Sequence, residues 1–190
     1  MKNLLSKITL LTLVSLLLMS FAEGQKLQQK RVHPNVSVGI PADFREMNED
    51  EIASKYRTVQ RSLGLYTEQY GAADLGITLK QIDETSWGQA DLPILEKIYR
   101  ATIMENFGQV DFLKEGRRIV NGQEVIYFEF VGRISGDAAY GNRVSGRYQY
   151  IQYALVEGDI VVFNFNCPAR LQYKWQETAR AVMNSVEIKN

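Results

Sequence analysis

The sequence predicts an α+β fold, a three-layer α/β/α sandwich in which a mostly antiparallel sheet of six or seven strands lies between about three helices. Residues 117–134 hold Asn121-Gly122 between two apolar runs, which is typical of a tight β-hairpin. The strand after this turn is apolar on both faces, whereas a sheet with one wet face would alternate apolar and polar residues. Segments with a 3.6-residue apolar repeat supply the layers that cover both faces.

Residues 1–22 are expected to be a secretory signal peptide, removed after Ala22 or after Gly24. Two lysines precede an uncharged run over residues 8–19, and small residues follow it. The run is too short to cross roughly 30 Å of hydrocarbon as a helix. The only thiol is Cys167, so no lipid anchor is expected at the mature amino terminus. We therefore expect an exported protein, periplasmic or secreted in a Gram-negative bacterium, without a membrane span after cleavage.

The mature chain is expected to be one domain over residues 35–190. Residues 23–34 are polar, lack periodicity and contain the only histidine, His33. They are interpreted as a flexible lead. Residues 36–41 alternate and stop at Pro41, which predicts a first strand that ends in a turn.

The next segments predict a helix and a hairpin. Within residues 47–57, Asn48 can cap a helix while Glu51, three residues on, reaches back to the cap. Residues 63–70 and 74–82 have an imperfect alternation and predict the two strands of the hairpin.

A second helix is predicted over residues 91–107. Glu96 and Arg100 can form an i,i+4 pair on its polar side. The apolar stripe that would cover the sheet comprises Ile94, Leu95, Ile98 and Ala101.

Two long hairpins and a closing helix complete the fold. The Asn-Gly hairpin is followed by residues 147–156 and 159–167, both of them apolar on two faces. Cys167 ends the second of these strands in phase with apolar neighbours, so a buried, inert thiol is expected. Residues 185–188 can return to the sheet edge as a short strand. The closing helix has an apolar stripe formed by Leu171, Trp175, Ala179 and Val182.

In this order of elements the chain resembles the PsbP-like superfamily, which groups photosystem PsbP proteins, bacterial DcrB-like exported proteins and a Ran-binding import factor. The resemblance covers residues 36–188. It is carried by the segments "VSVGIPADF", "VNGQEVIYFEF" and "YQYIQYALVEGDIVVFNF" and by the amphipathic helix that leads into "NSVEI". It implies an accessory or binding protein that is not an enzyme. No functional residue is carried over.

Most catalytic and cofactor chemistry has no support in the residues. One histidine and one cysteine do not supply a zinc site, and the histidine lies in a segment unsuited to activating a nucleophile. Neither glycine-rich phosphate motif occurs. The formal net charge is zero, so nucleic acid is not expected as a partner. We expect no cofactor and no metal.

One long connection breaks the regular pattern. Residues 133–147 place polar and basic side chains near one end of the sheet, where loops on a rigid scaffold often bind partners. The alternative is a solvated loop whose glycines only satisfy its turns. The candidate partner or ligand residues are Arg133, Asp137, Tyr140, Arg143 and Arg147.

The sequence favours an exported, non-enzymatic accessory or binding domain that acts on a protein partner or an envelope component. The first alternative is a small-molecule binder with a pocket between sheet and helix, lined by Tyr127, Tyr150 or Trp175. The second is a hydrolase with two buried carboxylates in a cleft.

Overall fold

The computed structural model describes residues 26–56, 62–81, 87–134 and 145–189. The expected signal peptide and three candidate loop residues, Asp137, Tyr140 and Arg143, lie outside the described residues.

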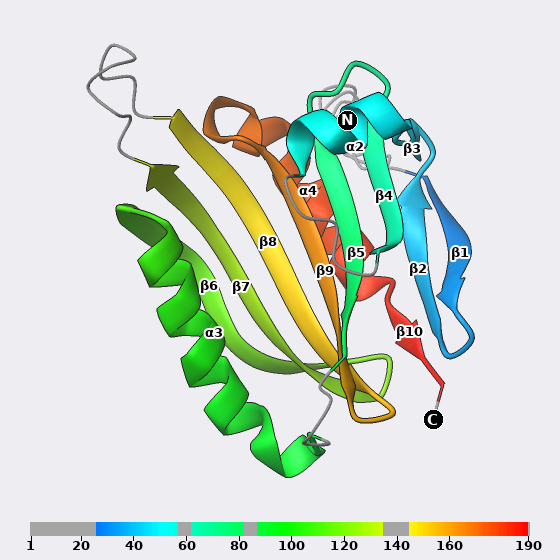
Figure 1. Cartoon of the computed structure of the whole chain (residues 1–190), viewed down its shortest axis with the longest axis vertical. Coiled ribbons are helices and arrows are strands. Elements are labelled where there is room, and N and C mark those ends of the chain that lie inside the picture. The colour runs from blue at the N-terminus through cyan, green and yellow to red at the C-terminus, as the bar shows by residue number, and fades with distance from the viewer. Residues whose placement is uncertain (1–25, 57–61, 82–86, 135–144, 190) are drawn as a thin grey trace, which may run out of the picture.

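A seven-stranded antiparallel sheet forms the centre of the molecule (Figure 1). Its spatial order is β3-β4-β5-β9-β8-β7-β6, so sequential hairpins account for most of its pairings. The strands are β3 Phe44–Glu46, β4 Ser62–Glu68, β5 Asp74–Lys80, β6 Gln109–Val120, β7 Gln123–Ile134, β8 Ser145–Val156 and β9 Asp159–Pro168.

Helices cover both faces of this sheet, which confirms the predicted three-layer arrangement. In Figure 1, α2 (Glu49–Lys55) and α3 (Leu92–Asn106) lie on one side of the sheet, and α4 (Gln172–Asn184) lies on the other. Short 3-10 turns, Gln89–Asp91 and Ala169–Leu171, precede α3 and α4.

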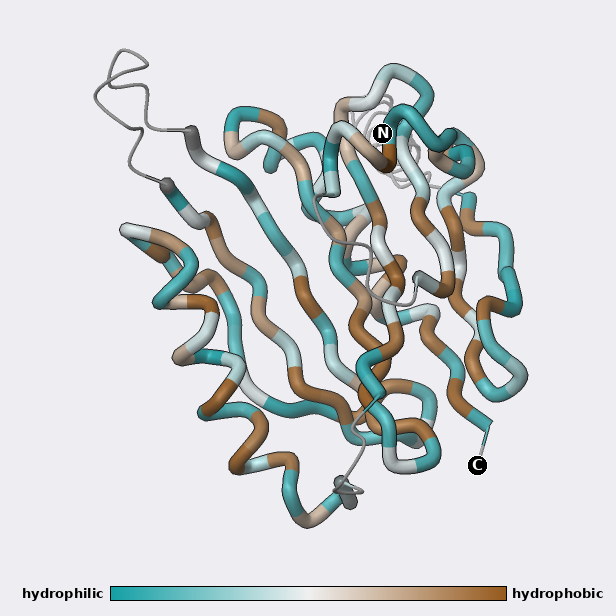
Figure 2. Tube along the Cα trace, viewed as in Figure 1, coloured by the Kyte–Doolittle hydropathy of each residue, from teal (hydrophilic) through white to brown (hydrophobic). Residues whose placement is uncertain are grey.

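The strands separate two apolar cores because neighbouring residues of a strand point to opposite faces. Tyr150 belongs to the core under α4, whereas the next residue, Ile151, belongs to the core under α3. Hydrophobic residues accordingly recur along the central strands (brown in Figure 2). The core under α3 includes Leu92, Leu95, Tyr99, Ile103, Ile126, Phe128, Phe130, Tyr153, Leu155 and Ile160. The core under α4 includes Leu75, Ile77, Val125, Tyr148, Phe163, Phe165, Trp175, Ala179, Val182 and Met183.

The predicted local signals are confirmed at the hairpin turn and the first helix. Asn121 and Gly122 both have positive φ, 47° and 86°, as a two-residue I′ turn requires. Asn48 accepts a hydrogen bond from the Glu51 amide at 2.9 Å, and the Glu51 carboxylate accepts one from the Asn48 amide at 3.0 Å. This capping box fixes the start of α2.

A second, three-stranded sheet corrects the prediction of a flexible lead. Within residues 23–34, Leu27–His33 form strand β1, which pairs with β2 (Val36–Pro41). The carboxyl-terminal strand β10 (Glu187–Ile188) pairs with the other edge of β2, and not with the large sheet. The side chains of β1 are mostly exposed, and backbone hydrogen bonds to β2 hold the strand. Because the strand buries few side chains, its sequence shows no apolar alternation.

The apolar face of α3 is also rotated from the predicted stripe. Leu95 is buried as expected, but Ile94 and Ile98 are 56 % and 46 % exposed. The buried face contains Leu92, Leu95, Tyr99 and Ile103, and the ring of Tyr99 stacks on Tyr153 of β8 with centroids 3.8 Å apart. Glu96 and Arg100 consequently pair with Arg117 and Glu115 of β6, and not with each other.

Candidate functional site

A polar area interrupts the apolar face of the sheet that α2 and α3 share. Gln149 on β8 pairs in register with Asn166 on β9, and Asn166 pairs with Asp74 on β5. Asp74 pairs in turn with Thr67 on β4. Side chains in such a row lie side by side on one face. The sheet therefore offers four polar neighbours where α3 no longer covers it.

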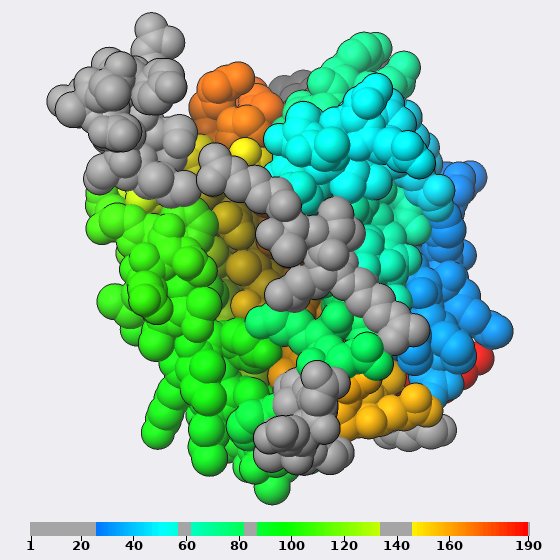
Figure 3. Space-filling view, viewed as in Figure 1, coloured from blue at the N-terminus to red at the C-terminus, as the bar shows by residue number. Residues whose placement is uncertain are grey.

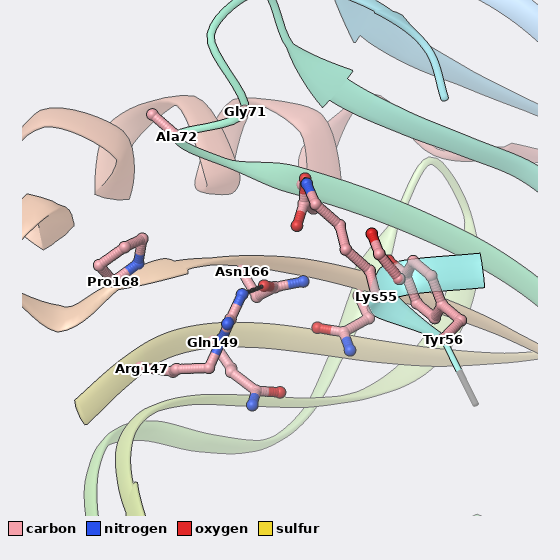
Figure 4. Close-up of a pocket in the computed structure, with 11 residues that line it drawn as sticks. Lys55, Tyr56, Gly71, Ala72, Arg147, Gln149, Asn166 and Pro168 are labelled. Carbon is pink, nitrogen blue, oxygen red and sulfur yellow. Dashed lines mark hydrogen bonds and ion pairs between the residues drawn. The ribbon is translucent and has the colours of Figure 1, made fainter. Parts of the chain in front are cut away.

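Beside this row lies a cleft of about 500 Å³, here called the α2 cleft. The side chains of Gln149, Asn164 and Asn166 form its amide floor. In Figure 3, atoms of β8 (yellow) reach the surface between α3 (green) and α2 (cyan). Figure 4 shows Lys55 and Tyr56 entering the cleft from the end of α2, and Arg147 beside Asn166. The lining residues are Ser54, Lys55, Tyr56, Gly71, Ala72, Asp74, Arg147, Gln149, Asn164, Asn166 and Pro168.

One wall of the cleft is an ion pair between α2 and β5. The ammonium of Lys55 donates to Oδ1 of Asp74 at 2.6 Å, and the Thr67 hydroxyl donates to the same oxygen at 2.8 Å. The side chain of Asp74 is only 7 % exposed. A buried carboxylate needs such donors, because burial without them would disfavour its charge. The pair also ties the last turn of α2 to the sheet.

The opposite wall carries Arg147, a residue that the sequence analysis named. Its guanidinium donates to Oδ1 of Asn166. Arg147 is exposed, whereas Asn166 is buried. The amide therefore holds one end of a long basic side chain at the rim of the cleft.

Tyr56 follows α2 directly and adds a phenol to the site. Burial, and after it the nearby Asp74 carboxylate, raise the pKa of this phenol to about 12, against a lowering effect of Arg147. The hydroxyl therefore stays protonated at neutral pH and can donate a hydrogen bond.

The structure separates the candidate loop residues that it describes. Arg147 lines the α2 cleft, but Arg133 pairs with Asp111 across β6 and β7. Sequence reasoning missed Lys55, Asp74 and Asn166. The available signal was the segment "FNFN", in which asparagine occupies alternate positions of an otherwise apolar strand.

Tyr127, Tyr150 and Trp175 would line the pocket that the small-molecule alternative needs, but their rings pack into the core under α4. Tyr150 and Trp175 are each 2 % exposed. The rings of Tyr127 and Tyr150 lie 6.1 Å apart, and the Arg118 guanidinium lies over both. The indole of Trp175 contacts Phe44 and Phe165. The α2 cleft lies on the other face of the sheet.

The buried carboxylates of the described residues do not form a pair. Asp74 binds Lys55, while Glu129 binds Arg180 on the opposite face of the sheet. Glu68 accepts backbone amides of its own turn, at 3.0 and 3.1 Å. Within the same residues, no three His, Cys, Asp or Glu side chains gather as a metal site would need.

A second hollow, of about 520 Å³, lies between the small sheet and the edge of the large one. It includes Gln28, Lys30, Phe44, Glu46 and Tyr66. Lys30 pairs with Glu46 inside it, so its charges cancel. The α2 cleft retains a cation and is the better candidate for recognition.

Comparisons with known proteins agree with this architecture. The solution structure of cyanobacterial PsbP (CyanoP) from Synechocystis sp. PCC 6803 aligns over 90 % of this chain and 96 % of its own, with a TM-score of 0.61 and 11 % identity. This likeness confirms the fold that the sequence predicted, which is the fold of a solved PsbP structure. LpqN, involved in cell envelope biogenesis of Mycobacterium tuberculosis, shares this PsbP-like fold over 87 % of this chain and 91 % of its own (TM-score 0.54, 12 % identity).

A mutant of the protein Mog1 has the PsbP-like fold as well, over 86 % of this chain and 96 % of its own, with a TM-score of 0.53 and 7 % identity. At such identities the likeness establishes the fold alone. No protein-family model matches the sequence, and no curated protein matches it significantly. In the described part of the chain, every helix is too short or too polar to cross a bilayer.

Proposed function

We propose that this chain is an exported, non-enzymatic accessory domain that binds a protein partner or an envelope component through the α2 cleft. The observation that carries the proposal is the convergence of Lys55, Tyr56, Arg147 and the amide floor on one concave surface. Two strands, β8 and β9, and the end of α2 supply these groups, so their geometry is set by the rigid sheet, as binding sites require.

Export is supported by the amino-terminal sequence. Two lysines, an uncharged run and small residues precede Glu23, in the order that a signal peptidase reads. We expect the protein recovered from cells that express the full sequence to begin at Glu23 or Gln25. Mass spectrometry of the intact protein tests this, and an intact Met1 in the accumulated protein would disprove processing.

A binding role is favoured over hydrolysis by the side chains of the cleft. Its one acidic residue, Asp74, is held by Lys55 and Thr67 and has no second carboxylate beside it among the described residues. General acid and base catalysis by carboxylates needs two groups in different protonation states. Amides and cations, in contrast, position a ligand without chemistry.

Cross-linked capture from cells tests the proposal. The full sequence with a carboxyl-terminal affinity tag is expressed in its host, cross-linked and purified as wild type, Arg147→Glu and Arg31→Glu. Arg31 is exposed on β1, away from the cleft, and serves as the charge-matched control. We expect a partner captured by wild type and by Arg31→Glu to be lost with Arg147→Glu. Equal capture by all three proteins would show that the partner does not bind through the α2 cleft.

A polar small molecule is the second candidate, because about 500 Å³ lies within the range of ligand sites. Native mass spectrometry of the protein purified from its host distinguishes a polar small molecule from a protein partner. A bound mass that Arg147→Glu removes, without any captured protein, would favour the small ligand.

A further inference from the structure

Within the described part of the chain, the charges of the α2 cleft leave one cation without an acidic partner. Among the residues that the structure describes, three charged side chains line the cleft: Lys55, Asp74 and Arg147. Lys55 and Asp74 neutralise each other at 2.6 Å. Among the described residues, the Arg147 guanidinium donates to the neutral amide of Asn166. The lining therefore carries a net charge of about +1, concentrated at Arg147.

The magnitude of this charge favours a carboxylate over a phosphate. A carboxylate carries a single negative charge, whereas a phosphate group carries about −1.5 to −2 at neutral pH. A guanidinium also presents five donors in a planar fork, of which Asn166 takes one. The remaining edge fits the two oxygens of a carboxylate in bidentate geometry. A dianion would leave charge uncompensated in the cleft.

The floor indicates what is attached to the carboxylate. Gln149, Asn164 and Asn166 line the cleft, and each carries an amide with both a donor and an acceptor. A peptide main chain presents the same pair of groups at each residue. The Tyr56 hydroxyl, which remains protonated, adds a donor beside this floor. An acidic peptide satisfies both the cation and the amides, whereas an isolated small anion satisfies the cation alone.

We propose that the α2 cleft binds an acidic peptide segment, with Arg147 pairing to one aspartate or glutamate carboxylate and the amide floor hydrogen-bonding to the peptide main chain. This inference rests on the proposed binding function and specifies its partner as protein.

Titration followed by two-dimensional NMR tests the inference. The sample is the protein purified from cells that express the full sequence. The first probe is a capped peptide with one glutamate between glycines, and its matched control replaces glutamate by glutamine. We expect dissociation in the millimolar range for the glutamate peptide, with shifts at Gln149 and Asn166. We expect the glutamine peptide to bind at least about tenfold more weakly, which corresponds to 1.4 kcal/mol.

Variants of Arg147 test whether its guanidinium causes the preference for the glutamate peptide over the glutamine peptide. Arg147→Gln should abolish the preference for glutamate, and Arg147→Lys should keep part of it, because lysine retains the charge but loses the fork. Arg31→Gln should bind like wild type. Arg147 is exposed, so we expect both of its variants to keep the wild-type melting temperature. An unchanged preference in Arg147→Gln would overturn the assignment.

Acetate and inorganic phosphate complete the design. Both should bind more weakly than the glutamate peptide. Acetate that binds as tightly as the peptide would overturn the role of the main chain, and phosphate that binds more tightly would overturn the charge argument. Lack of binding by every probe, with cellular capture still lost in Arg147→Glu, would refute this inference and leave the binding function standing. Peptide binding with capture unaffected would refute the cellular role instead.

Discussion

At the scale of single residues, Glu129 connects α4 to the sheet. Its carboxylate has no exposed surface and accepts hydrogen bonds from Arg180, Gln176 and Tyr148. Arg180→Met removes the cation and leaves a buried charge with two neutral donors. We expect the free energy of unfolding to fall by about 3 kcal/mol, measured by urea denaturation, because breaking a buried pair costs far more than breaking an exposed one.

Two matched variants separate charge from packing in this prediction. Arg117→Met removes a surface cation that pairs with Glu96 and Glu124, and should cost less than about 1 kcal/mol. In Arg180→Met combined with Glu129→Gln, the buried group is neutral, so part of the lost stability should return. Additive losses would show that Glu129 and Arg180 are not coupled.

Cys167 gives a second prediction at this scale. Its thiol is fully buried, and burial raises its pKa to about 11, with Arg147 lowering it slightly. A raised pKa means that the thiol stays protonated at mildly alkaline pH, and only the thiolate is reactive. We expect iodoacetamide to label the unfolded protein rapidly and to leave the native protein unlabelled at pH about 8. Rapid native labelling would show that this strand opens.

At the scale of elements, α2 should be sensitive to acid. Glu51 has its pKa lowered to about 2, chiefly by hydrogen bonds from Arg45 and then by the Asn48 amide. A lowered pKa stabilises the helix above the usual carboxyl range, and this support is lost as the pH falls from about 4.5 through about 2. We expect amide exchange at Tyr56, whose N–H bonds to Ile52, to accelerate in that window relative to the unfolded chain.

Glu51→Gln is the control for the acid prediction. Glutamine can still accept a hydrogen bond from the Asn48 amide, but it does not titrate. Exchange at Tyr56 in this variant should therefore lose its dependence on pH between about 4.5 and 2. The same acid response in both proteins would assign it to another carboxyl. Since Lys55 ends α2 and Tyr56 follows it directly, fraying of this helix would also open the α2 cleft.

Elements with local chemical signals could be predicted from the sequence, and elements held by distant contacts could not. The Asn121-Gly122 turn and the Asn48 capping box depend on residues beside them, and both are confirmed. Strand β1 depends on the ladder of β2, and the face of α3 depends on the ring of Tyr153. Neither cause is visible in a local window of sequence.

At the scale of the whole molecule, the α2 cleft illustrates the same limit. Arg147 was a sequence candidate because it follows a long polar connection. Lys55, Asp74 and Asn166 become neighbours only when β5 pairs with β9 and α2 packs across β5. One sequence gives no signal for that juxtaposition, apart from asparagines that alternate with phenylalanines in β9. The fold follows from apolar patterning, whereas the site follows from strand order.

The two apolar cores share the central strands, so they should unfold together. Trp87 packs against the core under α3, and Trp175 lies within the core under α4. These are the only two tryptophans of the chain. Trp87→Phe and Trp175→Phe therefore each leave a single fluorescent reporter on one face. In each variant we expect the fluorescence midpoint in urea to coincide with that of far-ultraviolet circular dichroism, as a two-state transition requires.

A sheet with two dry faces explains this cooperativity physically. Loss of α4 would expose Tyr150 while its neighbour Ile151 stayed covered, and the same strand would then hold one wet and one dry apolar face. Exposure costs roughly 25 cal/mol for each Å² of apolar surface. A sheet that lost its helix on one side would therefore be unstable. If Trp175 reported unfolding at clearly lower urea than Trp87, α4 and the small sheet would form an independently melting layer, and the two cores would not be coupled through the strands.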